Sequence, residues 1–191
     1  DQRFPENPIS ILANFADFDA DLTIRYGLGS FPGMHVESLL SERIFPVCSP
    51  SLIEKAGRLG GVADLAHHTL LYDEIADMGG QPPTWEYWAR EAGHRLPKPA
   101  RVRRFGQSNM VVQAAINGYG IALGREPLVV DALADGRLVR PFPDMVPSQF
   151  AYWLVCPAGS LRIDRIARFR EWLHGEVARQ PAITDASLRS A

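Results

Sequence analysis

The chain has 191 residues, of which 46% are hydrophobic and 22% are charged, and its formal net charge is −2. This length suits one domain or two small lobes, and the charge balance excludes a broad cationic surface of the kind that binds nucleic acid. The longest apolar run, 150–156, is much shorter than the roughly 20 residues that a membrane helix needs, so no membrane partner is expected.

The pattern of apolar residues switches repeatedly between strand-like and helix-like spacing. In chain order we predict a short helix or turn at 9–16, a strand at 20–26, a glycine-rich loop at 27–33, strands at 36–40 and 43–48, a helix at 50–56, a helical turn at 62–66 and a strand at 70–72. These are followed by a helix capped by Thr84 that ends at Gly93, a strand at 101–105, a helix that begins at Ser108 and ends at Gly118, a strand at 121–123, a helix at 126–134, strands at 138–141 and 150–156, a helix at about 160–178 and a disordered tail at 181–191. The alternation favours an α/β architecture with mainly parallel sheets.

Ser108 stands where a strand gives way to a helix, and Ser is a good N-cap residue. The first N–H groups of a helix have no partner within it, and the helix dipole adds about half a positive charge at that end. A carboxylate or a similar anion would therefore bind favourably there. The alternative is a purely structural cap, because any α/β protein caps its helices with such residues.

Motifs of known enzymes are absent: the sequence has no nucleophile elbow, no zinc-protease motif, no phosphate-binding loop and no Cys-x-x-Cys pair. The glycine clusters at 27–33 and 118–124 do not open a helix after a strand, as a dinucleotide site requires. The five histidines are scattered and favour exposed surface positions over metal ligation. We therefore predict no catalytic residue, no metal and no cofactor.

Three aromatic positions allow more than one interpretation. Tyr26, at the carboxyl end of a strand, either lines a ligand crevice or packs at its rim. Trp85 and Trp88 lie three apart on one helix and favour core or subunit contact over a stacking platform.

The two cysteines, Cys48 and Cys156, are too few for a disulfide framework and predict buried, reduced thiols, as in a cytoplasmic protein.

Taken in order, several segments resemble the effector-binding domain of LysR-type transcriptional regulators, in the branch of the glycine-cleavage activator and the β-lactamase regulator. The segments that carry the resemblance are Asp21-Leu-Thr-Ile-Arg-Tyr-Gly27 with Gly29 and Pro32-Gly33, Glu42-Arg-Ile-Phe-Pro-Val-Cys-Ser-Pro50, Asp64-Leu-Ala-His-His-Thr-Leu-Leu71, Ser108 with Gln113-Ala-Ala-Ile-Asn-Gly-Tyr-Gly-Ile-Ala122, Gly136-Arg-Leu-Val139, Tyr152-Trp-Leu-Val-Cys-Pro157 and Phe169-Arg-Glu-Trp-Leu173. Together they cover residues 20 to about 175.

The resemblance implies a two-lobe, periplasmic-binding-protein-like α/β fold (type 2), in which each lobe has a mixed, mainly parallel sheet flanked by helices. Lobe I would contain 1–46 and 150–180, and lobe II would contain 47–149. A small molecule would lie between the lobes. The implied ligand-binding residues are Ser108, Asn109 and Phe105 of lobe II, Tyr26 and Gly27 of lobe I, and Tyr152 beside the hinge.

The resemblance also implies a function, that of a cytoplasmic effector sensor without catalysis, in a homodimer or homotetramer. The helix at Ser108 would favour an effector with a carboxylate. DNA would be bound only through a winged helix-turn-helix that is absent from this sequence. The first part of lobe I also precedes Asp1 in such proteins, so we expect a fragment. A stand-alone solute-binding protein of the same fold is the first alternative, and an enzyme on a two-lobe scaffold is the second.

Overall fold

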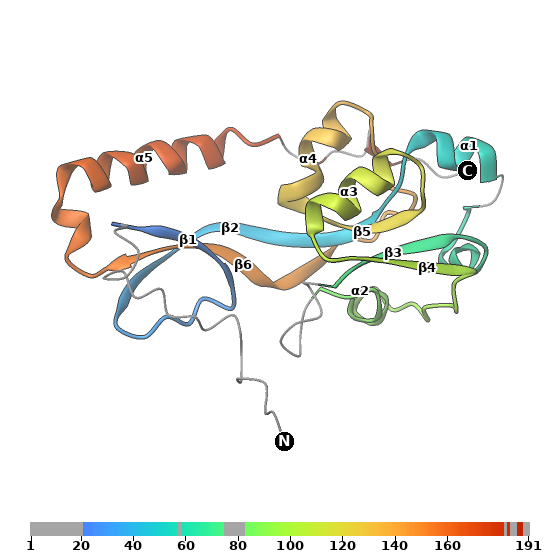
Figure 1. Cartoon of the computed structure of the whole chain (residues 1–191), viewed down its shortest axis with the longest axis horizontal. Coiled ribbons are helices and arrows are strands. Elements are labelled where there is room, and N and C mark those ends of the chain that lie inside the picture. The colour runs from blue at the N-terminus through green and yellow to red at the C-terminus, as the bar shows by residue number, and fades with distance from the viewer. Residues whose placement is uncertain (1–20, 57–58, 75–82, 182, 184–186, 189–191) are drawn as a thin grey trace, which may run out of the picture. The chain divides into compact units, whose positions relative to one another are not determined.

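The computed structural model describes residues 21–56, 59–74, 83–181, 183, 187 and 188 (Figure 1). The chain divides into two compact units: unit 1 contains the residues up to 42 together with 149–180, and unit 2 contains 43–148 together with the residues from 181. The chain passes from one unit to the other within two long strands, β2 (Met34–Val47) and β6 (Val146–Pro157). The helix predicted at 9–16 and most of the tail predicted at 181–191 lie outside the described residues.

Unit 2 is built on a mixed sheet. The end of β2 pairs antiparallel with β5 (Ile121–Arg125), which runs parallel to β3 (Thr69–Asp73), and β3 in turn runs parallel to β4 (Arg101–Phe105). Successive residues of a strand point to opposite faces, and the buried side chains follow this rule. Ile44, Leu70 and Ile121 enter one hydrophobic core, whereas the next residue of each strand enters another core.

Helices cover both faces of this sheet. The core around Ile44 and Leu70 is completed from α1 (Pro50–Ala56), the 3₁₀ turn η2 (Val62–His67) and α2 (Trp85–Glu91). The second core is completed by α3 (Ser108–Ile116) and α4 (Glu126–Ala134), which lie on the opposite side of the sheet from α2 (Figure 1). The sheet between two helical layers confirms the predicted α/β class.

The start of α2 follows the sequence prediction closely. The Thr84 hydroxyl oxygen accepts a hydrogen bond from the backbone N–H of Tyr87 at 3.1 Å, which confirms Thr84 as the cap. Trp85 and Trp88 are both buried in the core. Their indole N–H groups donate to the carbonyl oxygens of Leu71 and Asp144, at 3.1 and 3.3 Å, so the cost of burying these polar groups is offset.

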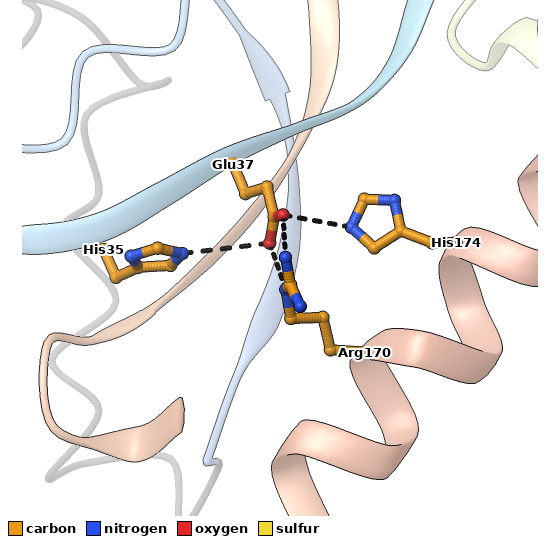
Figure 2. Close-up of polar contacts among 4 residues, drawn as sticks. All are labelled: His35, Glu37, Arg170 and His174. Carbon is orange, nitrogen blue, oxygen red and sulfur yellow. Dashed lines mark hydrogen bonds and ion pairs between the residues drawn. The ribbon is translucent and has the colours of Figure 1, made fainter. Parts of the chain in front are cut away.

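Unit 1 contains β1 (Thr23–Gly27), the parts of β2 and β6 that belong to it, the 3₁₀ turn η3 (Ser160–Arg162) and α5 (Asp164–Ala178). β1 pairs antiparallel with β6. An ion cluster joins β2 to α5, and Figure 2 shows Glu37 between Arg170, His174 and His35. Arg170 donates hydrogen bonds to both carboxylate oxygens of Glu37 through Nε and Nη2, and Nε lies 2.6 Å from Oε2. His174 Nε2 lies 3.3 Å from Glu37 Oε1.

Two predicted strand boundaries are wrong. The strands predicted at 36–40 and 43–48 form one strand. Glu42, which lies between the two predicted strands, is buried, and its carboxylate accepts a hydrogen bond from the Tyr26 hydroxyl at 2.7 Å. The strand predicted at 138–141 is reduced to isolated bridges from Val139 to Cys48 and from Arg140 to Leu188. Pro141 follows directly and has no N–H with which to extend a ladder.

Both cysteines are free and buried, as predicted. Burial raises the pKa of the Cys48 thiol to about 12, which leaves it unreactive at neutral pH. Among the described residues, no helix has the length and apolar character that crossing a bilayer requires.

Candidate functional site

The three parallel strands of unit 2 end at the same edge of their sheet. β3 ends at Asp73, β4 at Phe105 and β5 at Arg125. α3 begins at Ser108, three residues after β4, and α4 begins directly after β5. Because open α/β sheets bind ligands outside the carboxyl ends of their strands, this edge is the candidate site.

Ser108 has a different role from the one that its sequence predicts. Gln107 is the N-cap residue of α3, and Ser108 is the first residue of the helix. The Ser108 hydroxyl donates a hydrogen bond to Asp73 Oδ2 and accepts one from Arg125 Nη1 at 3.1 Å. The hydroxyl is therefore not a cap, because hydrogen bonds to a carboxylate and a guanidinium are stronger than a hydrogen bond to a helix N–H.

The backbone at the start of α3 still presents donors. The N–H of Met110 bonds to the carbonyl of Gln107 at 3.1 Å and to the side-chain oxygen of Asn109 at 2.9 Å. The N–H groups of Ser108 and Asn109 have no acceptor among the described residues. They are therefore the groups of this helix end that a ligand anion can reach.

A narrow pocket opens at the same edge. Its empty volume is about 350 Å³ with its open mouth included. Its lining is mostly apolar and carries two opposite charges; the residues are Leu71, Tyr72, Asp73, Pro83, Thr84, Trp85, Val111, Leu123 and Arg125. Sequence reasoning missed Asp73 and Arg125. Both directly follow apolar strand segments, which is the signal that singled out Tyr26.

Glu126, the residue that follows Arg125, forms an ion pair with Arg43. Arg43, on β2, bonds to both carboxylate oxygens of Glu126, with Nε 2.7 Å from Oε2. This hydrogen bonding raises the pKa of the Arg43 guanidinium further above its already high ordinary value. Glu126 is the first residue of α4, so the pair fixes the start of that helix against β2.

The other predicted contacts differ in their surroundings. Phe105 is half-buried and packs against the core beneath α3 and α4, whereas Asn109 is exposed. Tyr26, Gly27 and Tyr152 belong to unit 1. Tyr26 and Tyr152 are directly opposite each other on β1 and β6, with ring centroids 5.0 Å apart, and the Gly27 carbonyl accepts the Trp153 indole N–H at 2.8 Å. The predicted contact residues thus form two sets, one in unit 2 with Phe105 and Asn109 and one in unit 1 with Tyr26, Gly27 and Tyr152.

Glu42 is a further residue of this aromatic group that sequence reasoning missed. Its buried carboxylate holds the Tyr26 hydroxyl, and the Tyr26 ring stacks on Phe150 with centroids 5.4 Å apart. A charged residue between two predicted strands, two positions before the apolar run at 44–48, was the available signal.

The histidines give no metal site. No group of three or more potential ligands among the described residues could hold a metal ion. His68, which follows η2, is buried, against the expectation of exposed histidines. His35 and His174 face Glu37 in the ion cluster of unit 1 (Figure 2).

Residues 4–178 match the family model of the LysR substrate binding domain. The chain belongs to this family. The predicted resemblance is thereby confirmed, and the matched family is a binding domain rather than an enzyme.

Named relatives agree with this assignment. The chain is 38% identical over 160 residues to the glycine cleavage system transcriptional activator of Escherichia coli K12, covering 84% of this chain and 50% of that protein. It is 32% identical over 154 residues to the transcriptional activator AmpR of Enterobacter cloacae, covering 80% and 50%. The LysR domain described here therefore spans about half the length of these relatives.

Solved structures confirm the predicted fold. The effector domain of AmpR from Pseudomonas aeruginosa matches with a TM-score of 0.67 at 30% identity, covering 86% of this chain and 76% of that one. The AmpR effector binding domain from Citrobacter freundii matches with a TM-score of 0.69 at 27% identity, covering 87% and 78%.

Proposed function

We propose that this LysR domain senses a small-molecule effector and controls the activity of a transcriptional regulator. The family match over residues 4–178 carries the proposal, and the names of the relatives support it. The proposed whole protein is a cytoplasmic homodimer or homotetramer that binds DNA through a separate part of its chain. The described domain supplies the sensing step and has no catalytic role in this proposal.

The proposed binding site is the edge of unit 2 where Asp73, Ser108 and Arg125 meet. The N–H groups of Ser108 and Asn109 would donate to an anionic group of the effector, and the positive end of the α3 dipole would favour it. Arg125 would add a full positive charge beside the helix end.

Sensing requires that the effector prefers one arrangement of the regulator over another. A ligand shifts such an equilibrium only by its difference in affinity for the two states, and typical coupling is about 1–3 kcal/mol. We propose that effector binding changes the packing of regulator subunits and thereby the spacing of their DNA-binding parts.

Two substitutions of Ser108 separate its hydroxyl from its backbone N–H. Ser108→Ala removes only the hydroxyl. Ser108→Pro also removes the N–H, and the first position of a helix tolerates proline. Gln107 already has the extended backbone that a residue before proline requires, with φ −150° and ψ 135°.

The test begins with a thermal-shift screen of amino acids, small organic acids and muropeptides against the chain, followed by calorimetric titration of each compound that shifts it. We expect Ser108→Ala to weaken binding several-fold and Ser108→Pro to weaken it by at least a further ten-fold. Ser51→Ala, on the exposed start of α1, is the control and should bind as the wild type does. If both Ser108 variants fold and bind with unchanged affinity, the site is assigned wrongly.

A further inference from the structure

The chain crosses from one unit to the other a third time, after α5. Two crossings lie within β2 and β6, and the third follows Gln180, because the residues from Pro181 onward belong to unit 2. α5 itself belongs to unit 1 and ends at Ala178. A short piece of chain therefore joins the end of this helix to the part of unit 2 that holds the residues after it.

Three residues near the end of the chain contact unit 2, and we call them the C-terminal anchor: Ile183, Ser187 and Leu188. Ile183 packs against the core beneath α3 and α4. The Ser187 carbonyl oxygen accepts a hydrogen bond from the N–H of Arg140 at 2.7 Å, and the Ser187 hydroxyl accepts one from Arg140 Nε at 3.1 Å. Leu188 forms a parallel β-bridge with Arg140. The anchor thus combines apolar packing with backbone and side-chain hydrogen bonds.

The part of unit 2 that binds the anchor is tied to β2. Arg140 is 3% exposed, and its guanidinium lies over the ring of Phe45, a residue of β2, at 5.9 Å from the centroid. Its neighbour Val139 forms an antiparallel bridge with Cys48, directly after β2. Ser187 is also buried, with 7% exposed. Release of the anchor removes two hydrogen bonds from a buried arginine, so the bound state is favoured.

The length of the chain limits the distance between α5 and the core beneath α3 and α4 while the anchor is bound. Five residues of chain lead from Ala178 to Ile183, and they span at most about 18 Å when fully extended. A larger distance between the end of α5 and this core requires that the anchor leaves unit 2.

We infer that the C-terminal anchor is a releasable tether that restricts the movement of unit 1 relative to unit 2. While it is bound, only those arrangements of the units that fit the short connection are allowed. A ligand that favours any other arrangement must also supply the free energy that releases the anchor. The inference goes beyond the proposed function, because the tether acts in the presence and in the absence of an effector.

Two shortened chains that differ in the anchor test the inference. One ends at Gln180 and lacks the anchor, whereas the other ends at Leu188 and keeps it. Both are compared with the full chain after spin labelling of Arg168→Cys on α5 and Asp131→Cys on α4, two exposed positions in different units.

The native thiols do not compete for the label. Cys48 and Cys156 are both buried, and burial raises the pKa of each thiol above its ordinary value. Because the thiolate is the reactive form, the introduced exposed cysteines react first. Double electron–electron resonance then gives the distribution of distances between the two labels without any effector present.

We expect this distribution to broaden or shift in the chain that ends at Gln180 and to stay unchanged in the chain that ends at Leu188. The amide hydrogen of Arg140 should also exchange at least about ten-fold faster in the shorter chain, because its acceptor is lost. An unchanged distribution in a folded chain that ends at Gln180 would overturn the inference and leave the anchor as a cover for the core. A change of the same size in both shortened chains would overturn it too.

A double variant of the full chain replaces the truncation if the chain that ends at Gln180 does not fold. Ile183→Asp places a carboxylate against the apolar core, and Ser187→Ala removes the acceptor for Arg140 Nε. Ile183→Val, which keeps the apolar contact, is the matched control. The double variant should change the distance distribution and the control should not, and an unchanged distribution in the double variant contradicts the tether. No ligand is used, so either result leaves the proposed function standing.

Discussion

At the scale of single residues, charged side chains in this domain act mainly by fixing other groups. Ser108 is held by Asp73 and Arg125, the Tyr26 hydroxyl is held by Glu42, and Glu37 is held by Arg170. In each case the charged partner comes from a different element, so its position depends on the fold. Sequence reasoning found Ser108 and Tyr26 but missed Asp73 and Glu42, because their partners are distant in the sequence.

Glu37 should make the stability of unit 1 sensitive to acid. Its hydrogen bond to Arg170, opposed by partial burial and helped by the Arg170 and His174 charges, lowers its pKa from 4.5 to about 2. A carboxyl with a lowered pKa stabilises the folded state fully above its unfolded pKa. That contribution, about 1–2 kcal/mol once solvent screening is allowed for, should be lost as the pH falls from 4.5 toward 2.

Chemical denaturation of the wild type and of Glu37→Gln at pH 7 and at several values between 5 and 2 checks this prediction. The variant should be less stable at pH 7, and its stability should fall less steeply below pH 4.5. Glu171→Gln, on the exposed side of α5, is the control. Parallel acid curves for Glu37→Gln and the wild type would contradict the role given to the ion cluster.

At the scale of elements, the sequence predicts helices better than strand ends. Thr84 and the buried pair Trp85 and Trp88 lie as predicted, because a helix cap and a helical face depend on residues three or four apart. Strand pairing depends on partners far along the chain. The single strand β2 and the bridges at Val139 and Arg140 therefore could not be derived from local pattern.

The cap of α2 offers a quantitative check. Replacing Thr84 with Ala removes the acceptor for the Tyr87 N–H, and loss of such a cap typically costs about 1 kcal/mol. Thr84→Ser keeps the oxygen and should retain most of the stability. The midpoint of urea unfolding measures both variants. Equal losses in the two would show that packing of the threonine methyl group, and not the cap, stabilises the start of α2.

At the scale of the whole molecule, residues on separate strands and helices acquire a common role through the topology. The parallel order of β3, β4 and β5 places their carboxyl ends at one edge, where α3 begins. The α/β class and the Ser108 position were predictable from the alternation of apolar patterns. The meeting of Asp73 and Arg125 at the Ser108 hydroxyl was not predictable, because it depends on which strands become neighbours.

The most direct test of effector binding at this edge is a titration followed by the backbone amide resonances of the ¹⁵N-labelled chain. With the tightest-binding compound of the screen, we predict large, saturating shifts for Ser108 and Asn109 and small shifts for Gly60 and Gly61, at the start of η2 on the opposite helical layer. A compound that binds by calorimetry while the amides of Ser108 and Asn109 stay unshifted would contradict the account.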